Sequence, residues 1–386
     1  MKKLVDPFKR GLFLRKKLVK DGKVLCVDFA GTLQEKDIHK DLIKDVDVGR
    51  YTYRCKINIK DFDPEIRAAK GLPLFDFSDH KAIFDTINAD TNFDIPLWFL
   101  RKAGDKLENI TLYDLPLIYQ VMGCNFHDGT KTGGCIQCFV DDKSNVPNQK
   151  RGVWLTPYSV VHTFMSAKKS HGTRVLRISG GEPTLVLDHI LYVCEEWGRR
   201  LPYPVLLQFD TNLSTGRLIE HFEEEKIFPK NILQKIATYN PGVLVSIKGA
   251  TDQNLQENIQ SRMTIDEQID ALKMFVEARI DIYPCMYNPD ADHLREYMER
   301  MESIFENFLL KTRVFMTKIY SPTMERIANM AEKKGIDSEQ LLGLYVADWT
   351  ANYYRSCEIL NEMLMERYGL AYKSYERPGI KIILRK

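Results

Sequence analysis

From residue 109 onward, short apolar runs of the kind that form buried strands alternate with amphipathic segments of helical length. Strands are predicted at the end of 110–122 and at 175–179, 205–210, 242–248, 281–287 and 314–320. Helices are predicted between them at 157–170, 188–199, 220–237 (with a break near Pro229), 264–278 and 292–308. This alternation indicates βα units and a parallel sheet. Six such strands predict an α/β fold, a partial (β/α)6 TIM-like barrel with fewer strands than a closed barrel has.

The two flanks of this region have a different character. Residues 1–108 are mixed, with strand-like runs at 23–28 and 51–59, and they predict an N-terminal α+β extension of unknown role. Residues 323–386 predict a C-terminal helical segment, in which Asp337 or Ser338 caps a long helix that ends near Gly369. The chain is therefore divided into an extension at 1–108, a core at 109–322 and a helical segment at 323–386.

Composition and charge narrow the class of protein. The net charge of +2 gives no bulk argument for nucleic acid or membrane surfaces, and no apolar run is long enough for a membrane span. The basic segment 1–23 is interpreted as a solvated face, with a phosphate-bearing partner as the alternative. Eight cysteines, mostly isolated, do not form a secreted disulfide framework, so we expect a cytoplasmic protein.

Three cysteines follow the first predicted strand of the core in a C-x10-C-x2-C pattern, at Cys124, Cys135 and Cys138. A C-x2-C turn returns the second thiol beside the first, within reach of one metal centre. A closed zinc site or an electron-transfer cluster normally takes four protein ligands. Three thiolates therefore favour a cluster with one iron left open.

Polar motifs follow the next three predicted strands, as S-G-G-E-P-T at 179–184, D-T-N at 210–212 and S-I-K-G at 246–249. In a parallel βα array, the active site lies at the carboxyl ends of the strands. The glycines at 180 and 181 allow the backbone to approach a ligand closely, and Glu182 places a carboxylate beside them. Packing alone does not explain polar residues at successive strand ends, so these motifs predict a binding site.

Together with Phe139, these motifs make residues 109–322 resemble the radical SAM superfamily. The resemblance implies a [4Fe-4S] cluster held by Cys124, Cys135 and Cys138, and S-adenosylmethionine (SAM) bound through its amino group to the G-G-E-P segment. The family's usual spacing is C-x3-C-x2-C, whereas the first gap here holds ten residues. The cofactor contacts that the resemblance implies are Gly180, Gly181, Glu182, Pro183, Asp210, Thr211, Asn212, Ser246 and Lys248.

The resemblance also implies a reaction. SAM is cleaved reductively to a 5′-deoxyadenosyl radical, which abstracts hydrogen from a substrate. An electron donor such as flavodoxin or ferredoxin is then required. The strand-end motifs are similar to those of activating enzymes, which implies a protein or peptide substrate, with tRNA, a lipid or a small molecule as alternatives. No second C-x2-C follows residue 320, so no auxiliary-cluster domain is expected.

Two other functions compete with this hypothesis. The three cysteines and His127 are a chemically reasonable Cys3His set for structural zinc in a protein that is not an enzyme. A three-cysteine cluster used only for electron transfer is the other alternative. Both leave the polar motifs at the strand ends unexplained.

Overall fold

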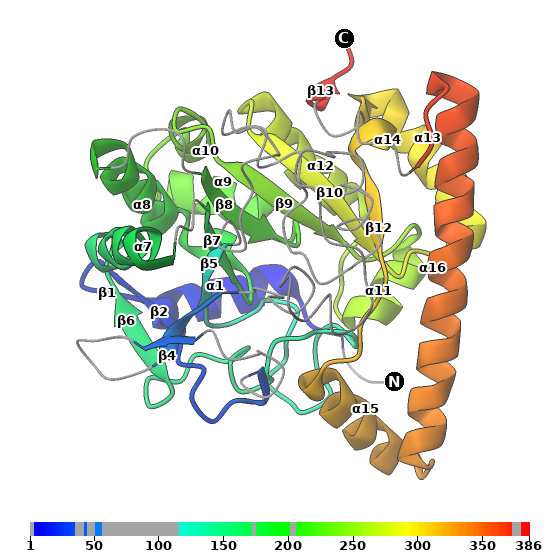
Figure 1. Ribbon diagram of the computed structural model, residues 1–386, viewed down its shortest axis with the longest axis horizontal. Helices are drawn as coiled ribbons and strands as arrows, with labels where there is room; N and C mark the ends of the chain where they lie inside the picture. Colours follow the sequence, from blue (N-terminus) through cyan, green and yellow to red (C-terminus); the bar gives the residue numbers. More distant parts are fainter. Residues whose placement is uncertain are drawn as a thin grey trace, which may run out of the picture.

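Six parallel strands form the centre of the computed structural model, which describes residues 4–34, 42–44, 51–55, 116–171, 175–200, 206–372 and 380–386 (Figure 1). Neighbouring strands in the sheet are consecutive along the chain, as in a βα-barrel, and their side chains are mostly buried on both faces. The predicted partial barrel is confirmed. The strands are β5 (Leu117–Val121), β7 (Val175–Gly180), β8 (Leu206–Thr211), β9 (Gly242–Ile247), β10 (Asp281–Tyr287) and β12 (Arg313–Phe315).

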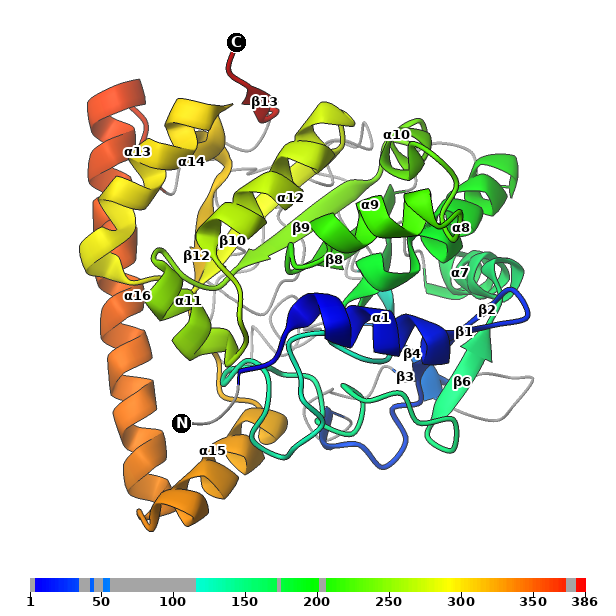
Figure 2. The same ribbon diagram turned by 180° about the vertical axis from the view of Figure 1, so that it is seen from behind.

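Helices connect these strands, and α9 and α12 lie on one face of the sheet (Figure 2). Local signals define their ends. For example, Thr264 and Glu267 form a reciprocal capping box at the start of α12. The elements are α7 (Pro157–His171), η2 (Pro183–Val186), α8 (Leu187–Arg200), α9 (Gly216–Glu224), α10 (Ile232–Ala237), α11 (Asp252–Ile259), α12 (Ile265–Glu277), η3 (Ala291–His293), α13 (Leu294–Ile304) and α14 (Phe308–Lys311).

Antiparallel strands extend the sheet beyond β5. β2 (Lys23–Val27) and β4 (Tyr51–Cys55) both pair with β5, and β2 also pairs with β1 (Val19–Lys20) and β6 (Gly152–Leu155). β3 (Leu42–Lys44) pairs with β4. The strands expected at 23–28 and 51–59 are therefore present, although the second is described only to Cys55, and residues 56–115 lie outside the described part of the chain.

The basic N-terminal segment forms a helix, α1 (Pro7–Leu18), which is only partly a solvated face. Leu14 and Leu18 are fully buried in the main core. Arg15 makes two hydrogen bonds to the carboxylate of Asp188, at 2.7 and 2.5 Å, and donates to the carbonyl of Leu185. α1 is therefore attached to the start of α8, and only its other side remains solvated.

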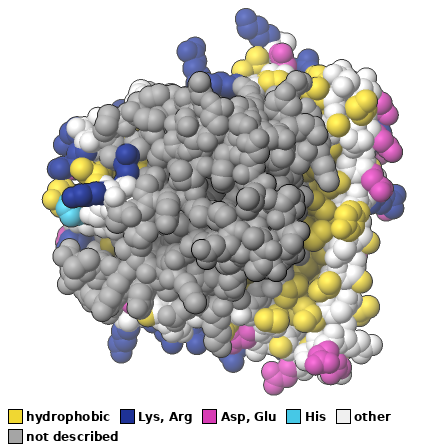
Figure 3. Space-filling view, in the orientation of Figure 1, with side chains coloured by type: hydrophobic (Ala, Val, Ile, Leu, Met, Phe, Trp, Pro, Cys, Tyr) yellow, Lys and Arg dark blue, Asp and Glu magenta, His cyan; other side chains and the backbone are white. Residues whose placement is uncertain are grey.

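The C-terminal region contains α15 (Ser321–Lys334) and the long helix α16 (Ser338–Tyr368), which Asp337 caps and which Gly369 ends in a left-handed conformation, as predicted. The two helices share a small core of Ile327, Ala331, Leu341 and Trp349. Figure 3 shows hydrophobic side chains gathered along α16. β13 (Ile383–Leu384) pairs with β11 (Phe305–Glu306).

One strand is shorter than predicted. The sequence predicts a strand at 314–320, but β12 ends at Phe315, and Tyr320 is the N-cap residue of α15. Pro322, in the first turn of α15, fixes the backbone for a helix there. In the described residues, no helix combines the length and the apolarity that crossing a membrane requires.

Candidate functional site

The cysteine loop, residues 122–151 between β5 and β6, begins at the carboxyl end of the first parallel strand. Its start is hydrogen-bonded to its later part, because Gly123 N–H donates to Ser144 O at 2.9 Å and Cys124 N–H donates to Asn145 O at 3.2 Å. The ends of β7, β8 and β9 follow at the same edge of the sheet. The four motifs predicted to share a site therefore meet at one edge.

The three thiols of the loop lie within electrostatic range of one another. Burial raises the pKa of Cys124 well above its ordinary value, and the charges of Cys135 and Cys138 raise it further. Burial likewise raises the pKa of Cys135 to about 11, while the positive charges of Lys248 and Arg326 act in the opposite direction. Three thiols in a low-dielectric site ionise together only when a cationic centre compensates them.

Two amide side chains point N–H groups at these sulfurs. Asn212, at the end of β8, lies with its Nδ2 3.8 Å from the Sγ of Cys124. Asn145, within the loop, lies with its Nδ2 4.0 Å from the Sγ of Cys138. Hydrogen bonds to ligating sulfurs are among the groups by which a protein sets the potential of an iron–sulfur cluster. The residues present therefore fit a thiolate-bound cluster.

Arg326 of α15 binds the backbone of the C-x2-C turn. Its side chain is fully buried and its Nη1 donates to the carbonyl oxygens of Cys138 at 2.9 Å and Ile136 at 3.3 Å. Its Nη2 donates to Val140 O at 3.4 Å and pairs with Asp142. The sequence analysis did not identify this residue, because backbone carbonyls are acceptors that every position offers and no motif marks them.

His127, in the ten-residue gap between Cys124 and Cys135, is engaged at both ring nitrogens. Gly129 N–H donates to its Nδ1 at 3.0 Å, and its Nε2 lies 3.2 Å from Asp142. Neither nitrogen is available as a fourth ligand. Among the described residues, no group of three or more His, Cys, Asp or Glu side chains is arranged to hold a single metal ion. The occupied ring nitrogens of His127 therefore disfavour the Cys3His form of the structural-zinc hypothesis.

The glycine pair of the S-G-G-E-P-T motif contacts the chain's own backbone. Gly180 has a φ of 130°, which other residues rarely adopt. A Cβ on Gly181 would overlap the carbonyl oxygen of Gly123, and Gly181 N–H donates to Val121 O at 3.0 Å. The expectation that these glycines let the backbone approach a ligand stays a prediction. In the folded chain, the two glycines allow the end of β7 to contact the start of the cysteine loop.

Glu182 is fully buried, and protein groups hold its carboxylate. One oxygen accepts the N–H of Asn212 at 2.8 Å, and the other accepts both the N–H and the hydroxyl of Thr184. Burial raises the pKa of Glu182 to about 7, and these hydrogen bonds oppose that rise. The side chain therefore joins the ends of β7 and β8, and Pro183 begins η2 directly after it.

The remaining predicted residues lie at the ends of β8 and β9. Asp210 makes a bidentate pair with Arg177 of β7, with both carboxylate oxygens 3.0 Å from Nε, and Thr211 is buried beside it. Ser246 is half-buried in β9. The ammonium of Lys248 lies 4.7 Å from the centre of the Tyr287 ring. Asp210 is thus committed to an ion pair, while Lys248 is directed towards the end of β10.

Two comparisons relate the chain to radical SAM proteins. The profile of the Radical SAM superfamily matches residues 121–301. No curated protein matches the sequence. The solved structures include the cobalamin-dependent S-adenosylmethionine radical enzyme OxsB with aqua-cobalamin bound, at 11% identity and a TM-score of 0.37, over 57% of this chain and 36% of that one. The structure of OxsB with aqua-cobalamin and S-adenosylmethionine bound is 12% identical, with a TM-score of 0.38. This match again covers 57% of this chain and 36% of that one. The chain thus spans about a third of the length of OxsB, and similarities this low carry no argument about its activity.

Proposed function

Residues 121–301 are a radical SAM superfamily domain, and from this premise we propose that the chain cleaves SAM reductively at a [4Fe-4S] cluster bound by Cys124, Cys135 and Cys138. Members of the superfamily bind such a cluster and SAM. When bound, the two groups supply a 5′-deoxyadenosyl radical that abstracts a hydrogen atom from a substrate. The observation that carries the proposal is the convergence of three mutually interacting thiols at the carboxyl ends of the strands.

The chain's own residues have distinct roles in this proposal. Arg326 and Asn145 hold the C-x2-C turn, and the side-chain amide of Asn212 contacts the sulfur of Cys124. The positive charges of Arg326 and Lys248 near Cys135 favour thiolate over thiol, and they also favour the more negative, reduced state of a bound cluster.

We further propose that SAM is bound at the ends of β7, β8 and β9. The carboxylate of Glu182 is already occupied by Asn212 and Thr184, so main-chain carbonyls of 180–183 are the acceptors proposed for its amino group. Lys248 is proposed for its carboxylate, as a mobile point charge. Residues proposed to complete the site are Asp210, Thr211, Asn212 and Ser246.

The substrate is proposed to be a protein or peptide, because the strand-end motifs are similar to those of activating enzymes. A tRNA, lipid or small molecule is the alternative. The proposed reductant is a flavodoxin or ferredoxin, and the proposed location is the cytoplasm. The division into an extension at 1–108, a core at 109–322 and a helical segment at 323–386 is kept as a proposal. Arg326 of α15 lies outside the matched domain and still contributes to the proposed site.

Anaerobic reconstitution with iron and sulfide tests the ligand assignment. The wild-type chain is expected to hold about four irons, with a broad absorption near ~400 nm, whereas Cys135→Ala and Cys138→Ala lose most of both. Cys357→Ala, in which a half-buried cysteine of α16 is removed, is the matched control and keeps the full iron content. A colourless wild-type protein that retains zinc would overturn the proposal in favour of the structural-zinc hypothesis.

A further inference from the structure

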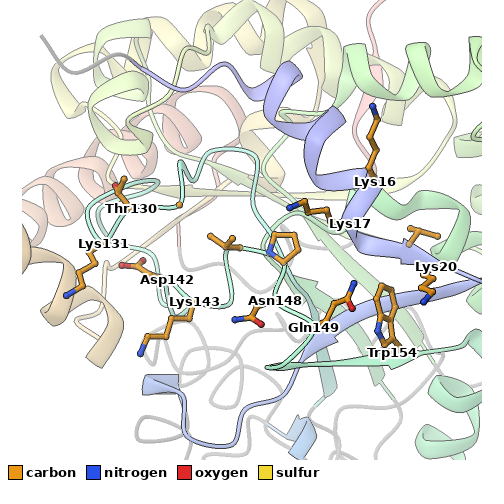
Figure 4. Close-up of a pocket in the computed structure, with 14 residues that line it drawn as sticks. Lys16, Lys17, Lys20, Thr130, Lys131, Asp142, Lys143, Asn148, Gln149 and Trp154 are labelled. Atoms are coloured by element: carbon orange, nitrogen blue, oxygen red, sulfur yellow. The ribbon is translucent and has the colours of Figure 1, made fainter.

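A cavity with a volume of about 680 Å³ lies between α1 and the outer side of the cysteine loop (Figure 4). Its walls come from 16, 17, 19 and 20 at the end of α1 and in β1, from 129–131 between the first two cysteines, from 142, 143 and 146–149 after the third, and from Trp154 of β6. None of the proposed cluster ligands or SAM contacts lines it. The cavity is therefore separate from the site at the strand ends.

Lysines dominate the wall of this cavity. Five of them line it together with a single acid, Asp142, whose carboxylate is already held by Arg326 and His127. The ion pairs within the described part of the chain use none of these five ammonium groups, which are all exposed. The lysines are Lys16, Lys17, Lys20, Lys131 and Lys143.

This concentration of charge contrasts with the chain as a whole. Positive and negative side chains nearly cancel over the full sequence, which leaves a net charge of only +2. Like charges around one concave wall repel one another, and their field is focused into the cavity. An anionic ligand relieves that repulsion, so the wall is built for a polyanion.

The other residues of the wall indicate what the anion is attached to. Figure 4 shows Lys131 and Lys143 at one end of the cavity and Lys20 with Trp154 at the other, with Asn148 and Gln149 between them. Lysine binds phosphate as a point charge, and a half-buried indole offers a face on which a planar ring can stack. The cavity volume is within the range of small-molecule sites.

We propose that this cavity binds a phosphate-bearing ligand of nucleotide size, with its phosphates on the lysines and its planar ring on Trp154. The proposal goes beyond the SAM-dependent reaction and does not depend on it. It accounts for the exposed side of the basic N-terminal segment, which the strand-end site does not use. It also gives the long gap between Cys124 and Cys135 a role, because 129–131 lie within it.

Isothermal titration calorimetry on the full, anaerobically reconstituted chain tests the proposal with pyrophosphate, AMP, adenosine and citrate as probes. Pyrophosphate and AMP are expected to bind, and both more weakly as salt is raised. Adenosine, which lacks the phosphate, is expected to bind at least about tenfold more weakly than AMP. Citrate, a polyanion without phosphate, is expected to bind more weakly than pyrophosphate.

Paired variants locate the binding. Lys131→Gln/Lys143→Gln is expected to weaken pyrophosphate and AMP binding by roughly tenfold. Lys226→Gln/Lys230→Gln removes two exposed lysines between α9 and α10 and is expected to change neither. Trp154→Ala is expected to weaken AMP binding but leave pyrophosphate binding intact.

Three results would overturn the inference: no binding of pyrophosphate or AMP, equal affinities in the two double-lysine variants, or equal affinities for AMP and adenosine. Iron content and SAM cleavage are measured on the same preparations. A chain that binds AMP through these lysines but holds no iron would reject the proposed function and leave this inference standing, and the reverse result would do the opposite.

Discussion

Single residues in this site serve the fold and the chemistry together. Glu182 illustrates the overlap. The sequence shows a carboxylate beside two glycines, which suggests a group that waits for a ligand. In the folded chain the same carboxylate accepts hydrogen bonds from Asn212 and Thr184. A sequence motif reports which residue is present, but it does not report whether that residue's hydrogen-bonding capacity is already used.

The pKa of Glu182 makes a prediction about stability. Burial raises this pKa from 4.5 to about 7, so between those values the folded state binds the proton more tightly than the unfolded chain. The free energy of unfolding therefore falls as the pH rises through this window, by up to about 3 kcal/mol. Urea unfolding of the cluster-free protein from pH 4.5 to 7.5 measures this slope. Glu182→Gln is expected to flatten it, and an equal slope in both proteins would contradict the pKa assignment.

Gly181 gives a second prediction at this scale. Gly181→Ala places a methyl group against the carbonyl of Gly123, next to Cys124, and is expected to cost roughly 3 kcal/mol of stability. We expect it to lower the iron content as well, because the start of the cysteine loop must move. Gly343→Ala in α16 is the control, since nothing lies near its added Cβ, and it is expected to gain up to about 1 kcal/mol. Thermal unfolding measures the stability of both variants, and iron analysis measures their cluster content. Full iron content in Gly181→Ala would contradict the account.

At the scale of elements, the buried strands were predicted well and their polar supports were not. β10 has the predicted bounds, β7 and β8 end one residue later than predicted, and β9 ends one residue earlier. The agreement is close because short apolar runs between helices identify buried parallel strands. β12 is shorter than its apolar run suggests. α1 was missed, because its buried face includes Gly11 and Arg15, neither of which marks a core position in a sequence pattern.

Helix α15 lies almost wholly in the segment 323–386 that was predicted to be helical, and it carries the residue that holds the C-x2-C turn, which was not predicted. Arg326→Met is expected to remove three carbonyl contacts and one ion pair, which lowers the stability by roughly 3 kcal/mol and reduces the iron content. Any cluster that remains is expected to have a more negative reduction potential, because a nearby positive charge is lost.

Two controls separate charge from packing in this experiment. Arg326→Lys keeps the positive charge but lacks the planar guanidinium. We expect its reduction potential to stay close to the wild-type value, while its stability falls. Arg355→Met removes an exposed arginine of α16 and should change neither quantity. Potentiometric titration followed by electron paramagnetic resonance gives the potential. Wild-type iron content and potential in Arg326→Met would show that the arginine does not position the turn.

At the scale of the whole molecule, segments outside the matched domain complete it on two sides. α15 lies against the cysteine loop, and α1 is attached to α8 by the pair between Arg15 and Asp188. Their positions could not be predicted, because each contact joins residues far apart in the chain and no alternation of polar and apolar positions encodes it. The helical character of α16 was predictable from its capping signals alone.

The Arg15 pair allows a test of how firmly α1 belongs to the core. Arg15→Met leaves the mostly buried carboxylate of Asp188 without its partner and is expected to destabilise the protein by roughly 3 kcal/mol. Adding Asp188→Leu is expected to restore most of that loss, because the uncompensated charge is then removed. Chemical unfolding of the two single variants and the double variant completes the cycle. Additive effects would indicate that the two side chains do not interact.

The central claim is that three cysteines hold a cluster at which SAM is reduced. The most direct measurement is the formation of 5′-deoxyadenosine when the reconstituted wild-type chain is incubated anaerobically with SAM and dithionite. We expect 5′-deoxyadenosine and methionine to appear in equal amounts in the wild type and in Cys357→Ala, and neither to appear in Cys138→Ala. A fully reconstituted, reduced wild-type protein that leaves SAM intact would contradict the account.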